Sequence, residues 1–286
     1  MARGAPIPDE GRPVTEAEIS QYVEREDDFA FELQILRLIE AMDVEVEHGG
    51  TYSDSITGKI RQFDFRVEIR SPEVVVLLAI EAKNVNQFGP LLISRTPRRS
   101  HESFHEVFGG TTNRPVIVRG RDGRSYVSGH PQQMRKMGGA TFYRETALVG
   151  RKVTALKRSA DGLEGSDRDI FERYSQAISS SHGLVQRAVC DLVSARYNTP
   201  VIVLPIAVIQ DHGLWVVDFV SADEAPAPTS TDDVDFFIGH DIEEFVDPEY
   251  PSKMTISHLR FMTAAGLQNF LARIQRDRDF RRQLAG

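Results

Sequence analysis

Residues 60–83, IRQFDFRVEIRSPEVVVLLAIEAK, decide the fold of this chain. Apolar and polar residues alternate over 60–70, which predicts a strand with one buried face. A Ser-Pro step then predicts a turn. Residues 74–80 form a continuous apolar run rich in β-branched side chains. Such a run is typical of a strand buried on both faces, and this one ends in an acid and a lysine two residues apart.

Three charged side chains are expected to meet at the end of that second strand. If the two strands pair antiparallel through the turn, Asp64 lies beside Glu81, and Glu81 and Lys83 share one face. Charges at the end of a buried strand are costly unless they pair or bind something. Neighbouring carboxylates favour a cation, and Mg²⁺ suits because it takes one or two carboxylates and keeps water and phosphate oxygens in its shell. The alternative is a salt-bridged strand end, with Glu81 against Arg66 and Lys83 against Asp64.

A helix is expected before these strands, over about 16–42 with a break near 26, because apolar residues recur there at helical spacing. Glu32 shares a face of this helix with three aliphatic residues, Ile35, Leu36 and Ile39. This acid therefore borders the buried stripe. We expect it to point toward the carboxylates of the two strands.

The remaining pattern predicts an α/β protein with a mixed central sheet flanked by helices. We expect residues 1–13 to be a disordered tail and residues 14–286 to form one domain, with a long insert at about 85–165 and a flexible loop at about 221–233. The further predicted strands are 44–47, 114–119, 201–209, 214–220 and 236–238; the further helices are 170–193 and 259–284; and 159–167 is a predicted loop.

Charge is unevenly distributed along the chain. The net charge is −8, yet residues 94–158 hold 14 basic residues against 4 acids. This asymmetry favours a surface for a polyanion, and the candidate phosphate contacts are Arg61, Arg95, Arg98 and Arg99. The alternative is that the two sets of charges face each other within the fold.

The sequence also indicates in which cellular compartment the protein is expected. No apolar run approaches the ~20 residues of a membrane span, and the N-terminus lacks the apolar stretch of a signal peptide. Cys190 is the only cysteine, so no internal disulfide is possible. We therefore expect a cytoplasmic protein that does not enter the membrane. Cys190 and Trp215 are both expected to lie in the core.

An acid on a first helix, an Asp on a second strand and Glu-x-Lys ending a third resemble the signature of the PD-(D/E)XK nuclease superfamily, above all its restriction-endonuclease-like and Mrr-like members. The pieces here are FEL at 31–33, GKIRQFD at 58–64 and IEAKN at 80–84. Phe63 stands where the motif has proline. The resemblance covers about 24–84 and a helix with two strands at 170–220, and it implies a restriction-endonuclease-like fold.

The resemblance also implies roles for the site residues. Asp64, Glu81 and the Ala82 carbonyl would bind Mg²⁺ or Mn²⁺. Glu32 would steady a second metal or a metal-bound water, and Lys83 would activate the attacking water. The implied reaction is hydrolysis of a phosphodiester bond in DNA, with RNA as the alternative. The oligomeric state stays open. Cutting both strands often calls for two active sites, which a homodimer or a larger defence or processing complex on the nucleic acid would provide.

Two other functions stay open. A catalytically silent nucleic-acid-binding or scaffold protein of the same fold would cleave nothing, and the intact set of Asp64, Glu81 and Lys83 argues against it. HESFH at 101–105 matches H-E-x-x-H, which on a helix holds Zn²⁺ through His101 and His105 with Glu102 as the general base. The two glycines that follow leave barely two turns for such a helix, so a zinc hydrolase is the weaker alternative.

Overall fold

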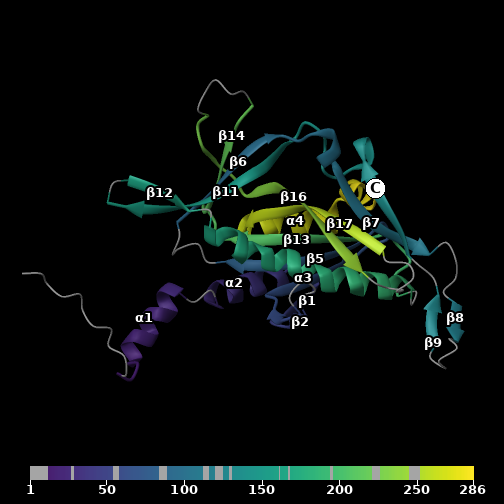
Figure 1. The fold of residues 1–286 in the computed structure, drawn as a ribbon, viewed down its shortest axis with the longest axis horizontal. Helices are drawn as coiled ribbons and strands as arrows, with labels where there is room; N and C mark the ends of the chain where they lie inside the picture. The colour runs from purple at the N-terminus through teal and green to yellow at the C-terminus, as the bar shows by residue number, and fades with distance from the viewer. Residues whose placement is uncertain are drawn as a thin grey trace, which may run out of the picture.

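The computed structural model describes residues 12–26, 29–53, 58–83, 89–111, 116–119, 125–128, 131–160, 162–166, 168–193, 196–220, 226–244 and 252–286 (Figure 1). Its helices are α1 (Glu16–Glu26), α2 (Phe29–Glu40), α3 (Arg168–Val193), α4 (Ala264–Arg276) and α5 (Arg278–Ala285). Its strands are β1 (Glu45–His48), β2 (Thr51–Ser53), β3 (Ile60–Gln62), β4 (Phe65–Arg70), β5 (Val75–Lys83), β6 (Leu91–Pro97), β7 (Phe104–Thr111), β8 (Val116–Arg119), β9 (Ser125–Ser128), β10 (Pro131–Met137), β11 (Leu148–Ser159), β12 (Gly162–Ser166), β13 (Val201–Ile209), β14 (Leu214–Asp218), β15 (Thr229–Ser230), β16 (Asp233–Glu244) and β17 (Ser252–Thr263).

One large mixed sheet organises these elements, in the order β1-β4-β5-β13-β17-β16-β11-β6-β14-β15. β1, β4 and β5 form an antiparallel meander. β13 then lies parallel to β5, and β17 parallel to β13. Because Lys83 pairs with Ile209 and Ile209 with Thr263, these three strands end at the same edge of the sheet. The protein is therefore of the mixed α/β class that the sequence predicts.

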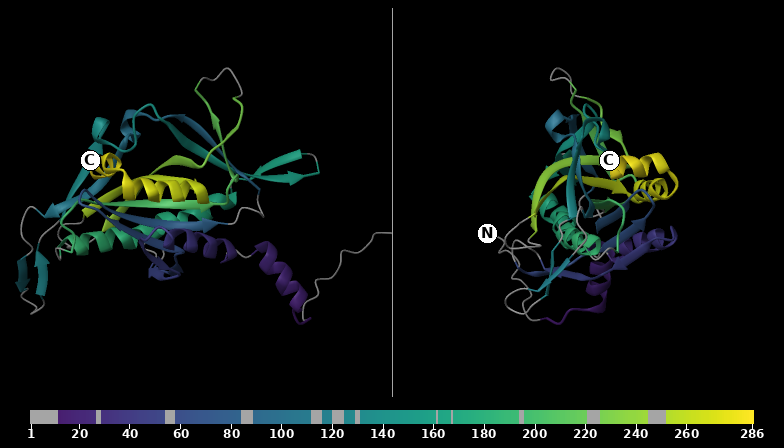
Figure 2. Two further views of the ribbon diagram at one scale, coloured as in Figure 1. Left: turned by 180° about the vertical axis from the view of Figure 1, so that it is seen from behind. Right: turned by 90° about the vertical axis from the view of Figure 1, so that its right-hand side faces the viewer.

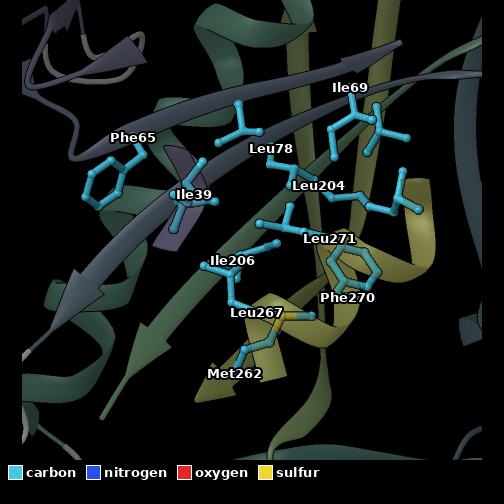
Figure 3. Packing of buried hydrophobic residues seen from close by; sticks show 14 of the residues in the cluster. Ile39, Phe65, Ile69, Leu78, Leu204, Ile206, Met262, Leu267, Phe270 and Leu271 are labelled. Carbon is cyan, nitrogen blue, oxygen red and sulfur yellow. The ribbon is translucent and has the colours of Figure 1, made fainter. Parts of the chain in front are cut away.

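Helices cover both faces of this sheet (Figure 2). On one face α2, α4 and α5 pack on alternate residues of the central strands, and Figure 3 shows this cluster around Leu78, Leu204, Ile206 and Leu271. On the other face α3 covers the intervening residues of β5 and β13. β5 is consequently buried over eight of its nine residues, which explains its unbroken apolar sequence.

Several sequence predictions agree with the structure. The strand predicted at 201–209 is β13, and the helix predicted at 170–193 is α3, which begins two residues earlier. The helix expected over 16–42 is α1 followed by α2, and the break lies at 27–28, outside the described residues. Among the described residues, no helix combines the length and apolar character needed to cross a bilayer.

The expected helix at 259–284 is wrong in its first residues. Residues 252–263 form β17, which lies between β13 and β16, and α4 begins only at Ala264. The side chain of Thr263 accepts a hydrogen bond from the backbone N–H of Gly266 and caps the helix. Side chains that fit a helical face also fit a strand buried on both faces, so the periodicity alone did not separate the two.

The middle of the chain also differs from expectation. The predicted insert at about 85–165 supplies β6, β7, β10, β11 and β12 to the same sheet. The loop expected at 159–167 contains β12, and the strand expected at 236–238 is part of β16, which has twelve residues. The alternating strand expected over 60–70 divides into β3 and β4. Residues 1–11 of the predicted tail and 221–225 of the predicted loop lie outside the described residues.

The two residues expected in the core are less buried than predicted. Cys190 does lie on α3, but it is exposed. Trp215 lies on β14 and is half-buried, with its indole N–H donating to the carbonyl oxygen of His212. β14 is the last strand but one in the sheet order, so few neighbouring elements are available to cover one of its faces.

Truncation of a residue in the cluster of Figure 3 should destabilise the protein strongly. Leu78 is fully buried between α2 and α4, and Leu78→Ala should lower the free energy of unfolding by about 2–5 kcal/mol through lost burial and a cavity. Leu163→Ala is the matched control, because Leu163 on β12 is 66% exposed; it should change stability by less than about 0.5 kcal/mol. Equal effects in urea unfolding would contradict this packing.

Candidate metal-dependent hydrolytic site

Asp64 and Glu81 face each other at the end of the β-meander. The antiparallel register of β4 and β5 ends at the pair Phe65–Ile80, so Asp64 comes directly before β4 at the level of Glu81. Asp64 Oδ2 accepts a hydrogen bond of 2.8 Å from the backbone N–H of Ala82. The carboxylate thus takes the place that a backbone acceptor of β4 would occupy if that strand continued.

Lys83 completes a compact group of three charged side chains. Its Nζ lies 2.7 Å from Glu81 Oε1 and 3.8 Å from Asp64 Oδ2. The side chains of Glu81, Asp64 and Lys83 are 2%, 13% and 14% exposed. The sequence prediction that these three residues come together is confirmed, and we call them the charged triad.

Burial raises the pKa of Glu81 to about 8. The negative charges of Asp64 and Glu32 contribute to this increase, while the ion pair with Lys83 opposes it. The short contact with Lys83 by itself would favour an ionised carboxylate, but desolvation outweighs it. Glu81 Oε2 is buried and has no hydrogen-bond partner among the described residues. A cation at this oxygen would therefore relieve both the burial of charge and the missing partner.

Glu32 lies beside the charged triad. It is on the first turn of α2, and its Oε2 is 3.8 Å from His48 Nε2. The His48 ring stacks on Phe65, which follows Asp64 in the chain, with ring centroids 5.0 Å apart. Glu32 acts on Glu81 through its charge. Sequence analysis did not single out His48, although its place at the end of β1, next to the Asp-bearing strand, was a usable signal.

The oxygen atoms at the charged triad provide part of the ligand set of a small divalent cation. Among the described residues no three His, Cys, Asp or Glu side chains come close enough together to hold a metal. Asp64, Glu81 and the Ala82 carbonyl are the available donors. The N–H and C=O of one strand residue point to the same neighbouring strand, so the Ala82 carbonyl faces the same side as the N–H that Asp64 binds. Mg²⁺ accepts such a sparse set because water completes its shell.

Arg66 is held between the meander and α3. Its guanidinium lies 4.2 Å from the centroid of the Phe63 ring and donates to the carbonyl oxygen of Ser180. Gly183 makes room for it, since a Cβ there would lie 2.6 Å from Arg66 Nη2. Burial lowers the pKa of Arg66. No ion pair between Arg66 and Glu81 forms in the part of the chain described, and Lys83 contacts both acids, so only the Lys83–Asp64 half of the simple salt-bridge alternative is present.

The four arginines proposed as phosphate contacts have different surroundings. Arg98 was predicted wrongly: its side chain is 1% exposed and bonds internally to Asp235, His258 and the Arg144 carbonyl. Arg95 forms a two-point ion pair with Asp218, at 2.7 and 2.9 Å. Arg99 is exposed, and Arg61 is half-buried on β3.

Internal pairing also absorbs other arginines of the basic stretch. Arg135 pairs with Glu106, and Arg151 pairs with Glu102. For these pairs the alternative expectation holds, that opposite charges face each other within the fold. The basic residues of the stretch that remain exposed, such as Lys157 and Arg158, lie on the ribbon of β11 and β12.

The H-E-x-x-H motif does not form a zinc site of the helical kind. His101 lies in a single 3₁₀ turn (Ser100–Glu102), and His105 lies on β7. The two ring nitrogens of His105 contact the Thr141 hydroxyl and the Leu284 carbonyl, and burial lowers the pKa of this ring to about 4. Glu102 is engaged by the guanidinium of Arg151. The motif therefore serves packing and internal pairing.

Comparison of the chain with protein-family models, with curated proteins and with solved structures gives no match.

Glu81→Gln should change the dependence of stability on pH. Native Glu81 has a pKa of about 8 against an ordinary value of 4.5. Between these values the native state binds more protons than the unfolded state, so the free energy of unfolding falls as the pH rises. One such group contributes at most about 1.4 kcal/mol per pH unit. Urea unfolding from pH 5 to 8 should show the wild type losing stability relative to Glu81→Gln, and parallel curves would contradict the burial of an ionisable Glu81.

Proposed function

We propose that the chain is a metal-dependent nuclease that hydrolyses phosphodiester bonds in DNA. The observation that carries the proposal is the charged triad, in which two carboxylates and one ammonium meet at the end of a buried strand. Such a group is costly to bury. Its chemistry suits a phosphate ester, since the ammonium offsets negative charge on the phosphoryl oxygens while the carboxylates recruit a cation.

Each residue of the site has a role in this proposal. Asp64, Glu81 and the Ala82 carbonyl would hold Mg²⁺ or Mn²⁺, which when bound lowers the pKa of a water molecule and polarises the phosphate. Lys83, close to both acids, would orient the attacking water and neutralise charge on the phosphate. Glu32 would hold a second water or metal, with His48 beside it.

The order of elements supports the same proposal. α2 carries Glu32, the second strand of the meander begins after Asp64, and the third ends in Glu81 and Lys83. α3 then leads to β13, which is parallel to β5. This is the succession on which the resemblance to the PD-(D/E)XK nucleases rests, including the helix and strand at 170–209. We therefore propose the restriction-endonuclease-like fold for this part of the chain.

A projecting β-ribbon near the site supports a nucleic-acid substrate. β11 and β12 form a two-stranded ribbon that extends from the sheet (Figure 1), and all five residues of β12 are exposed. Gly89, six residues after Lys83, packs against the Leu156 carbonyl. Because six residues span at most ~22 Å, the ribbon begins within that distance of Lys83. A two-stranded ribbon fits the major groove of DNA, and this one exposes Lys157 and Arg158.

A catalytically silent DNA-binding protein of the same fold is the second candidate function. The observation that favours it is that, in the described ranges, no three metal-ligating side chains converge. Lys83 contacts both carboxylates, so in a silent protein the charged triad would be a neutralised ion-pair cluster. The two candidates share DNA binding and differ only in cleavage.

Asp64→Asn and Lys83→Ala should each abolish metal-dependent cutting. Supercoiled plasmid and single-stranded DNA would each be incubated with Mg²⁺, Mn²⁺ or EDTA. Because each change removes a group that acts on the phosphate or its cation, we expect a loss of at least about 10²-fold. The matched controls are Asp279→Asn and Arg276→Ala, two exposed residues of α5 and α4 on the opposite face of the sheet, which should cut like the wild type.

Cutting that survives both Asp64→Asn and Lys83→Ala would sink the proposed site. A wild type that binds DNA in a salt-sensitive manner but cuts nothing under any metal condition would establish the silent alternative instead.

Lys157→Glu combined with Arg158→Glu should weaken binding of duplex DNA and flatten its salt dependence. Loss of two phosphate contacts should reduce the slope of log K against log salt by about 1.8. Fluorescence anisotropy in EDTA, from 50 to 200 mM salt, measures this without cleavage. Arg276→Ala controls for loss of positive charge elsewhere, and an unchanged slope in the ribbon variant would show that the DNA does not contact the ribbon.

A further inference from the structure

A cavity of about 220 Å³ lies between α3, β11, β16 and β17, outside the charged triad. Its walls are mostly apolar and include Tyr174 and Ile178 of α3, Phe236 of β16 and Phe261 of β17. An apolar cavity of about 150 Å³ already takes up benzene. This one therefore has room for a larger planar ring.

The aromatic walls suit a flat ligand. The Tyr174 and Phe261 rings meet edge to face with centroids 4.7 Å apart, and Phe236 meets Phe261 in the same way at 5.9 Å. Each ring is thus braced by another, so the walls are held in place before any ligand arrives. Bases stack on aromatic side chains with little dependence on sequence.

The cavity and the charged triad lie on the same face of the sheet. Glu81 pairs with Ala207, and Ala207 pairs with Phe261, so the three residues form one row across β5, β13 and β17. Residues in register on neighbouring strands share a face, and two strand spacings amount to ~10 Å. The backbone of Phe261, in the cavity wall, therefore lies ~10 Å from that of Glu81 in the triad.

A lysine stands at the rim of the cavity. Lys152 of β11 lines the cavity and is exposed. An anionic group attached to a ring inside the cavity would find this ammonium at the surface.

We propose that this cavity binds the nucleobase of a nucleotide, with the phosphate near Lys152. The choice of ligand rests on the proposed function, since a strand whose phosphate lies at the charged triad would bring a base within reach of the cavity. The base comes either from that strand or from a free nucleotide, and the chemistry recognised is the same in both cases.

Binding of 2′-deoxynucleoside 5′-monophosphates to the full chain in EDTA tests the proposal, by calorimetry or by NMR. We expect the nucleotides to bind and 2′-deoxyribose 5-phosphate, which lacks the base, to bind at least tenfold more weakly. Ser175→Trp places a large ring in the cavity and should weaken nucleotide binding at least tenfold. Gln176→Trp, the next residue of α3 and not part of the cavity wall, should leave it unchanged.

Lys152→Ala provides a second test that leaves the walls intact. It should weaken nucleotide binding severalfold, with Arg276→Ala as the control for charge. Equal binding with and without the base, or nucleotide binding unaffected by both Ser175→Trp and Lys152→Ala, would overturn the proposal. Binding of indole without any binding of nucleotides would also overturn it and assign the cavity to an uncharged apolar ligand.

Cleavage separates this inference from the proposed function. If nucleotides bind through the cavity but the wild type cuts no DNA, the nuclease proposal fails and the cavity stands. If the wild type cuts DNA but no nucleotide binds, the cavity proposal alone fails. An oligonucleotide with one abasic position identifies the source of the base: weaker binding of that oligonucleotide assigns the cavity to the strand, and unchanged binding together with nucleotide binding assigns it to a free nucleotide.

Discussion

A carboxylate buried at the end of a doubly covered strand is the constraint on which the rest of the structure depends. β5 is apolar because α2 and α4 cover one of its faces and α3 the other, so the charge of Glu81 has to be compensated locally. Lys83 supplies that compensation through its ion pair with Glu81, while the negative charge of Asp64 opposes it. Lys83 also lies near Asp64, whose carboxylate accepts a hydrogen bond from the backbone N–H of Ala82. These contacts make the strand end tolerable, and they are the basis of the cation and phosphate site that we propose.

A second buried polar network joins the middle of the chain to the sheet. Arg98, after β6, bonds to Asp235 of β16 and to His258 of β17. Burial lowers the pKa of His258 to about 3, so its ring is neutral and accepts the bond from Arg98. Tyr143 stacks on the same ring. Arginines of a basic sequence stretch can therefore stabilise the fold. An acid within the protein forms an ion pair with such an arginine, which is then not available to an external polyanion.

The local pattern of apolar and polar residues predicted the strands and the helix in which that pattern is strongest. The apolar runs of β5 and β13 and the amphipathic α3 lie where the sequence placed them, and a hairpin register brought Asp64 to Glu81 as expected. β17 was mistaken for the start of a helix, and the strands of the presumed insert were not recognised. Their partners are far away in the sequence: β11 pairs with β6 and with β16, and no local pattern encodes such pairings.

The sequence by itself therefore determined the α/β class, the buried strand that ends in Glu81 and Lys83, and the neighbourhood of Asp64. These three features follow from the periodicity of apolar side chains along the chain and from one short turn between two strands. Only the tertiary structure decided that Arg98 is internal, that His105 is a packed core histidine and that an aromatic cavity lies in the same row as Glu81. The physical reason is that burial and charge pairing depend on which distant strands and helices meet, and those meetings are set by the packing of the whole chain.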